Sequence, residues 1–283
     1  MRWWIELRKN YMAQVALVFI VLIIFMALMA PVFGFDERAD AGDLEIRNLP
    51  PFWYAKGVWK YPLGCDVQGR DILSRIVYGS RTSLFIALLA VSISTSIGMA
   101  VGLIAGYYGG KIDDVIMRIV DAVISIPGIL LTLIAITLWT PSVVSVASFI
   151  GLTHWVWQAR TARSKILSLR EEPFIVAAKV SGASDWRIVS RHIIPNILTT
   201  ILVIMTTQIG YMIIIESSLS FFGMTGTTIS WGWDISQGRD YLSTAWWITS
   251  MPGLAILITV ISFNILGDWL RDVLDPRLRG IIQ

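Results

Sequence analysis

The sequence predicts an all-helical, polytopic membrane protein with six transmembrane helices, and three observations support this fold class. Apolar residues make up 55% of the 283 residues and charged residues only 15%, whereas an average soluble domain is about 25% charged. The mean hydropathy is +0.67. Six apolar stretches each approach the ~20 residues that a helix needs to cross a bilayer.

These values also exclude several classes of protein. An ordinary soluble enzyme, a disordered tail and a secreted disulfide scaffold do not have this composition. Cys65 is the single cysteine, so no disulfide can form within the chain. The formal net charge of +3 is a small excess of positive charge. It does not indicate nucleic-acid binding, and we expect the chain to lie in the lipid bilayer.

The apolar stretches define the expected spans. The first follows Arg2, Arg8 and Lys9 and is too long for a signal peptide, so we expect a retained anchor. Pro127 and Pro252 each remove a backbone donor, which predicts a kink that acts either as a hinge or as a static bend. The spans cover residues 12–33, 83–107, 115–139, 141–158, 197–222 and 246–270.

The polar segments divide the chain further. Residues 1–35 hold a cytoplasmic N-terminus and the first span, residues 36–82 an extracytoplasmic loop, residues 83–271 a core of five spans and residues 272–283 a cytoplasmic tail. This orientation places 14 Lys and Arg residues on the cytoplasmic side and eight on the other. Within the loop, residues 66–81 predict an amphipathic helix on the outer surface, which either anchors the loop or contacts a partner.

The basic segment between the fourth and fifth spans, residues 160–196, predicts two short helices joined by a glycine bend. Glu172 followed by proline is typical of a helix start, because the missing N–H costs nothing in the first turn. Gly182 would end this helix, since glycine accepts the left-handed conformation. Ser184 would cap the second helix, and Pro195 would close it before the fifth span.

The first of these helices carries a face of small side chains. Ala177, Ala178 and Ser181 fall on one side at helical spacing, and the face ends at Gly182. Small side chains permit close approach of a partner, which favours a docking element. The alternative interpretation is a connector that lies on the membrane surface.

The same segment resembles the EAA loop of ABC importer permeases. That pattern reads Glu-Ala-Ala, three residues, Gly, nine residues, then Ile-x-Leu-Pro. Here Val176 replaces the glutamate, His192 the isoleucine and Ile194 the leucine, and the spacing is unbroken. The strict matches are Ala177, Ala178, Gly182 and Pro195.

The resemblance extends over most of the chain, to the second permease of dipeptide, oligopeptide and nickel importers. It implies the type I, MetI-like importer permease fold with an additional N-terminal span. It also implies a heterodimer with a sister permease, two cytoplasmic ATPases that use ATP and Mg, and an extracytoplasmic binding protein. The further matching segments are residues 61–75, 106–127, 191–196, 216–223, 231–232 and 264–277.

By this resemblance, the helix that ends at Gly182 sits in a groove on one ATPase, and ATP-driven closure of the ATPases turns the permease outward. Short peptides are the expected cargo; oligosaccharides and nickel complexes are alternatives within the same branch. A self-contained carrier would usually show internal repeats with broken helices, and none is evident. The residues assigned to coupling are Glu172, Ala177, Ala178, Ser181, Gly182 and Pro195.

The sequence shows no catalytic motif, so we expect a non-catalytic subunit that binds no cofactor or metal. A phosphate-binding loop needs Gly, four residues, then Gly-Lys-Ser/Thr. At Gly110 and Lys111, alanine stands at the first glycine position and isoleucine follows the lysine. The only two histidines, His154 and His192, belong to no cluster with cysteines or acids.

Four charged residues fall in the expected spans, and Arg271 directly follows the sixth. Arg118 and Asp121, three residues apart, predict an ion pair that is either functional or structural. Asp268 and Arg271 predict a pair that anchors the sixth span. Glu216, in the fifth span, either lines the translocation path or hydrogen-bonds within the bundle.

Overall fold

A computed structural model describes residues 2–139, 142–226 and 228–274. Over these residues the chain is helical, with no strand and one isolated bridge between Cys65 and Asp71. The prediction of an all-helical fold is therefore confirmed. The predicted start of the fourth span at residue 141 and the tail from residue 275 lie outside the described residues.

Nearly all of the secondary-structure elements are α-helices. Three short turns accompany them, η1 (Leu44–Ile46), the π-helical η2 (Val189–Ile193) and η3 (Arg239–Tyr241). The helices are α1 (Arg2–Lys9), α2 (Tyr11–Met29), α3 (Phe35–Asp40), α4 (Ile72–Tyr108), α5 (Gly110–Ile124), α6 (Gly128–Thr137), α7 (Val143–Arg170), α8 (Pro173–Val180), α9 (Asp185–Ile188), α10 (Ile194–Phe221), α11 (Trp231–Gly238) and α12 (Trp247–Leu274).

Among the described residues, four helical segments are long and apolar enough to cross a membrane. They are α2, α4, the run from Asp185 to Phe221, and α12, and the pair α5–α6 makes a fifth if it is counted as one span. That pair is bent by 80° at Pro127, so the third predicted span is broken. Pro252, by contrast, lies inside a continuous α12. The fourth predicted span lies in α7, which is long enough but not apolar enough to pass the same test.

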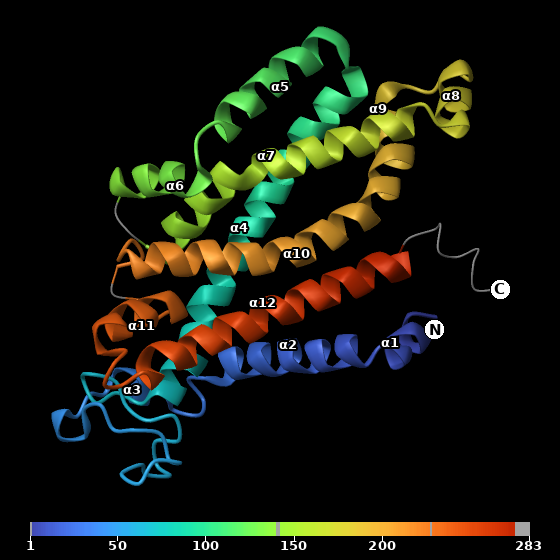
Figure 1. The fold of residues 1–283 in the computed structure, drawn as a ribbon. Coiled ribbons are helices and arrows are strands. Elements are labelled where there is room, and N and C mark those ends of the chain that lie inside the picture. The colour runs from blue at the N-terminus through green and yellow to red at the C-terminus, as the bar shows by residue number, and fades with distance from the viewer. Residues whose placement is uncertain (1, 140–141, 227, 275–283) are drawn as a thin grey trace.

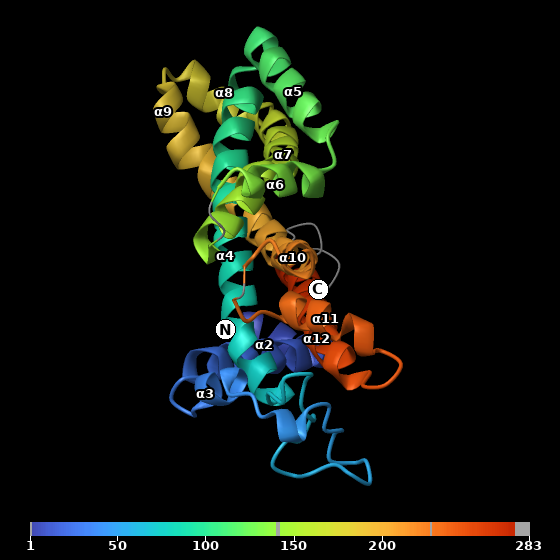
Figure 2. The same ribbon diagram turned by 90° about the vertical axis from the view of Figure 1, so that its left-hand side faces the viewer.

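The helices run between two ends of the molecule (Figure 1). One end, which we call the α8 end, holds α8, α9, α1 and the C-terminal end of α12. The opposite end, the α11 end, holds α11, α3 and the loop from residue 41 to residue 71. Helices α2 and α10 run toward the α11 end, and α4, α7 and α12 run back (Figures 1 and 2).

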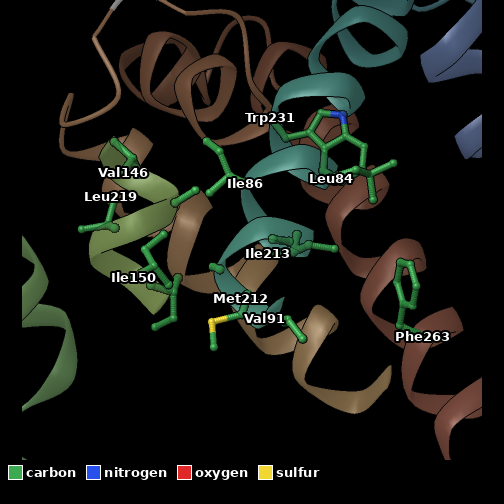
Figure 3. Close-up of a cluster of buried hydrophobic side chains, with 14 of the residues drawn as sticks. Leu84, Ile86, Val91, Val146, Ile150, Met212, Ile213, Leu219, Trp231 and Phe263 are labelled. Atoms are coloured by element: carbon green, nitrogen blue, oxygen red, sulfur yellow. The ribbon is translucent and has the colours of Figure 1, made fainter. Parts of the chain in front are cut away.

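The main core lies where α4, α7 and α10 meet. Figure 3 shows Ile86 of α4, Ile150 of α7 and Met212 of α10 pointing into it, with Trp231 of α11 and Phe263 of α12 at its edge. These apolar side chains are almost fully buried. The core therefore ties together three helices that are far apart in sequence.

Glycines bring α4 and α7 into close contact. A Cβ atom added at Gly98 would lie 2.5 Å from the Cβ of Gln158, and one added at Gly102 would lie 2.5 Å from the carbonyl oxygen of Ala159. Small residues spaced four apart allow membrane helices to approach closely. The sequence analysis did not single out this pattern.

The predicted surface helix over residues 66–81 is wrong. From Ile72 onward these residues are the first turns of α4 itself, and Asp71 caps it by accepting hydrogen bonds from the backbone N–H groups of Leu73 and Ser74. Ile72 is 2% exposed and packs with Trp247 at the start of α12. The apolar side that suggested a membrane-facing stripe is thus covered by protein.

Candidate functional site

The segment that contains α8 and α9 has the predicted helix, glycine bend and helix. Helix α8 has proline in its first turn directly after Glu172. Gly182 follows it with φ +79°, and its N–H donates to the carbonyl of Lys179 at 3.0 Å. The conformation at Gly182 explains why glycine stands there. Neither Glu172 nor Ser184 caps its helix with a side-chain hydrogen bond.

Pro195 does not close the second helix, contrary to prediction. The chain passes from α9 through the π-helical turn η2 into α10 without leaving the helical path. Pro195 lies in the first turn of α10, where its missing N–H is tolerated, and the wider π turn absorbs the change of register. The side-chain amide of Asn196 donates to the carbonyl of His192 at 2.6 Å.

Two isoleucines hold the segment to the rest of the protein. Ile175 of α8 is 2% exposed and Ile188 of α9 is 0% exposed. Both pack in a cluster with Ile166 of α7 and Ile197 of α10. The hydroxyl of Tyr107, near the end of α4, donates to Asp185 at 2.7 Å. A displacement of α8 or α9 would therefore act on the ends of α4, α7 and α10.

The outer face of the same segment is uncovered. Ala177, Ser181 and Gly182 are exposed, whereas Ala178 is partly buried against the isoleucine cluster. The predicted small-residue face is thus divided between the solvent and the protein. Around it lie large exposed apolar side chains: Phe174, Val176, Val180 and Trp186.

A hollow of about 540 Å³ lies between α8 and the ends of α4 and α7. Tyr107 and Tyr108 line it from α4, Arg170 from α7 and Lys179 from α8. The hollow offers aromatic rings and positive charge beside the exposed face of α8. Together they form a surface that can receive another polypeptide.

The ion pair predicted between Arg118 and Asp121 is wrong. Asp121 pairs with Arg160 of α7, because α5 packs against α7. Arg118 is exposed and makes no ion pair with the described residues. Exposed pairs of this kind contribute roughly 0–1 kcal/mol to stability.

The pair predicted between Asp268 and Arg271 is also not formed among the described residues. Both side chains are exposed near the end of α12. Exposed charges three residues apart on a helix gain too little to hold two side chains in one geometry. Neither residue therefore anchors α12 in the predicted way.

Glu216 is fully buried inside the bundle. Its carboxylate accepts hydrogen bonds from the hydroxyls of Ser220 at 2.6 Å and Ser217 at 3.3 Å. The side chains of Ser83 on α4 and Ser230 before α11 are further hydrogen-bond partners. Hydrogen bonding within the bundle, one of the two interpretations, is therefore present, and a role in the path stays a prediction.

The α11 end contains a buried ionic network that the sequence analysis missed. Arg75 of α4 is 2% exposed and donates to Asp234 of α11 at 2.8 Å and to the carbonyl of Ala39 at 2.8 Å. Arg70 donates to Asp66 at 2.7 Å. No spacing signals the central pair, since its two members are 159 residues apart.

The cysteine lies beside this network. Cys65 is buried, and its backbone carbonyl accepts a hydrogen bond from the indole of Trp247 at 3.4 Å. Burial and the nearby carboxylates of Asp71 and Asp66 raise the pKa of its thiol to about 12. A thiol in this state is unreactive at neutral pH.

Comparison with known proteins identifies this architecture. Residues 98–280 match the family described as binding-protein-dependent transport system inner membrane component. The chain belongs to this family. Residues 1–51 match the N-terminal transmembrane domain of oligopeptide transport permease C. Over the described residues, no group of three histidines, cysteines or acids could hold a metal ion.

Curated relatives match nearly the whole chain. The dipeptide transport system permease protein DppC of Haemophilus influenzae is 34% identical over 98% of this chain and 94% of its own length. A putative peptide transport system permease of Brucella suis is 38% identical over 97% of this chain and 90% of its own. The probable D,D-dipeptide permease DdpC of Escherichia coli is 34% identical over 97% and 90%.

This family membership assigns the chain to a class. It is a multi-pass membrane permease in a transport system, and it is not an enzyme. The family's dependence on a binding protein implies that substrate-binding and ATPase proteins work with it. The exposed α8 segment is the candidate contact with such a protein.

Proposed function

We propose that this chain forms half of the translocation pathway of an ATP-driven peptide importer. Its fold is then the MetI-like importer permease fold with six spans, in which α5–α6 and α7 are the third and fourth. Both termini and the α8 end lie in the cytoplasm, in agreement with the distribution of basic residues. The observation that carries the proposal is the α8 segment, attached by two buried isoleucines and exposed on its outer face.

In this proposal the exposed face of α8 docks into a groove on one of two ATPases, and a sister permease completes the pathway. Closure of the ATPases upon ATP binding displaces α8, and the isoleucine cluster carries the displacement to α4, α7 and α10. Packed interfaces transmit such movement because they repack between discrete states. Ala177, Ser181 and Gly182 contact the ATPase, while Ala178 and Pro195 keep the segment in place, and Glu172 precedes α8.

Short peptides are the cargo that the named relatives favour. The same machinery could instead import oligosaccharides or nickel complexes, because the binding protein selects the cargo. The chain itself binds no cofactor in this scheme, and ATP and Mg are used by the ATPases.

Reconstitution tests the proposal. The chain is co-purified with its sister permease, two ATPases and binding protein, and placed in vesicles. We expect ATP-dependent uptake of labelled dipeptides, which is lost with Ala177→Glu although the chain still inserts. Leu198→Ala, on an exposed part of α10, is the control. Peptide uptake without the ATPases would indicate a self-contained carrier and contradict the proposal.

A further inference from the structure

A stripe of mainly polar and aromatic side chains, with Ile204 among them, follows one face of α10 and α7. On α10 its members are spaced by four, three, one and three residues, and on α7 by four, so each set shares a helix face. Two hollows open along it, of about 10 Å³ and about 410 Å³. The α7–α10 stripe consists of Thr200, Ile204, Thr207, Gln208 and Tyr211 of α10 and Trp157, Thr161 and Lys165 of α7.

The wider hollow lies halfway along α10. Trp157 is 53% exposed and Tyr211 44% exposed, and Thr207 and Gln208 lie between them on its wall. In hydrocarbon, an amide or hydroxyl without a partner costs free energy. A glutamine at the middle of a membrane-spanning helix therefore faces water or polar groups, not lipid.

The predicted fourth span ends at residue 158, next to Trp157, but α7 continues beyond it to Arg170. The indole therefore lies partway along α7 and not at the end of the helix. This exposed indole lines the wider hollow from the α7 side.

The narrower hollow has unpaired polar atoms on its wall. Thr95 is 6% exposed and Gln158 is 4% exposed. The hydroxyl of Thr95 and the side-chain oxygen of Gln158 have no hydrogen-bond partner among the described residues, and both residues line this hollow. Such buried atoms require a partner, and the volume is close to that of one water molecule. These two unpaired atoms therefore give the narrower hollow, whose wall is otherwise mainly apolar, a place for one water molecule.

The stripe differs from the closely packed contact between α4 and α7. Tight membrane-helix contacts use small residues, as α4 does against α7 at Gly98 and Gly102. The stripe instead has the large rings of Trp157 and Tyr211 on the wall of a hollow of about 410 Å³. A hollow of this size leaves space for another molecule beside α10.

We propose that the α7–α10 stripe lines the translocation pathway and binds the backbone of the passing peptide. The inference rests on the proposed function and adds to it the residues that meet the cargo. Hydroxyls, an amide and aromatic rings suit peptide groups, which both donate and accept hydrogen bonds. The stripe has no acid, and its one charge, Lys165, complements a peptide carboxylate. Recognition of backbone explains how one pathway accepts many side chains.

Accessibility of introduced thiols tests whether the stripe faces water. Cys65 is buried, so the native chain serves as a silent background. We make Thr207→Cys and Gln208→Cys, with Leu198→Cys and Leu202→Cys as matched controls that are exposed on α10 but outside both hollows. In the reconstituted complex, a charged, membrane-impermeant thiol reagent should modify the stripe positions at least about tenfold faster, since thiolates form in water.

The cargo is tested on the same variants. Saturating dipeptide with binding protein and ATP should slow modification at position 208 about threefold or more, as expected when a site is occupied most of the time. Equal rates at stripe and control positions, or cross-linking of the stripe thiols to the sister permease alone, would overturn the proposal.

Transport separates this inference from the proposed function. Gln208→Leu should lower peptide uptake about tenfold, the effect of one lost hydrogen bond to cargo, while complex assembly stays unchanged. Leu202→Gln, outside the stripe, should not lower it. If the unmodified complex imports no peptide, the proposed function is wrong. If the unmodified complex imports peptide and Gln208→Leu is equally active, the proposed function stands and only the role of the stripe is wrong.

Discussion

The two ends of the molecule are held together by different forces. At the α11 end, the buried Arg75 joins α4 to Asp234 of α11 and to the backbone of Ala39. At the α8 end, two isoleucines and one hydroxyl, that of Tyr107, attach the segment. Apolar side chains pack at both ends, and a buried pair of charged groups is added at the first.

The difference fits the roles that the proposed function gives to the two ends. A buried charge pair holds one geometry, since any separation leaves a charge without its partner in a low dielectric. Isoleucines in a cluster can slide and repack with a smaller loss. The α11 end is therefore suited to a fixed frame and the α8 end to transmitting movement, and each of the following substitutions tests that contrast.

The largest effect is expected at the α11 end. Arg75→Ala should destabilise the protein by about 3–5 kcal/mol, because it leaves the carboxylate of Asp234 buried and unpaired. Thermal unfolding of the purified protein measures this. Arg239→Ala, in an exposed pair with Asp240, is the control and should change stability by less than about 1 kcal/mol. Similar shifts for both variants would contradict a fixed frame.

The next effect concerns the attachment of α8. Ile175→Ala should cost about 2–5 kcal/mol locally, the usual range for a buried isoleucine. Hydrogen exchange should show α8 opening while the amides of α11 stay protected. Val176→Ala, with an exposed side chain in the same helix, is the matched control. Loss of protection at both ends would mean that the two ends are not independent.

These contrasts show how far sequence reasoning reached. Hydropathy and turn residues predicted the helical class, the bend at Gly182 and the start of α8, because these depend on local chemistry. Ion pairs between residues that are far apart in sequence could not be predicted in this way. Arg75 with Asp234, and Asp121 with Arg160, join separate helices. In each predicted pair, Arg118 with Asp121 and Asp268 with Arg271, the two residues are neighbours on the same helix. In the fold, Asp121 pairs with Arg160 instead, and the other three side chains are exposed.

A smaller effect is expected from the hydrogen bond between α4 and α9. Tyr107→Phe removes the hydroxyl that donates a hydrogen bond to Asp185. The carboxylate of Asp185 remains exposed to water. The loss in stability should be about 1.5–2 kcal/mol, the lower part of the range for a hydrogen bond to a charged group, because Asp185 is exposed. Uptake per ATP hydrolysed should fall as well, since α4 and α9 would move less tightly together. Tyr108→Phe is the control. An equal fall in uptake per ATP hydrolysed in this variant would show that the hydrogen bond between Tyr107 and Asp185 has no part in coupling.

The smallest change in stability is expected where the proposed function predicts a large loss of activity. Val180 is 84% exposed at the end of α8, so Val180→Asp should alter stability by no more than about 0.5 kcal/mol. A charge on the docking face should nevertheless weaken binding of the ATPases, because an unpaired charge would be buried in the contact. Co-purification of the ATPases with the variant chain measures this, with Val32→Asp, exposed just beyond α2, as the control. If Val180→Asp retains the ATPases as well as the control does, α8 is not the contact. A loss confined to Val180→Asp would show that the loosely attached end is the one that meets the partner.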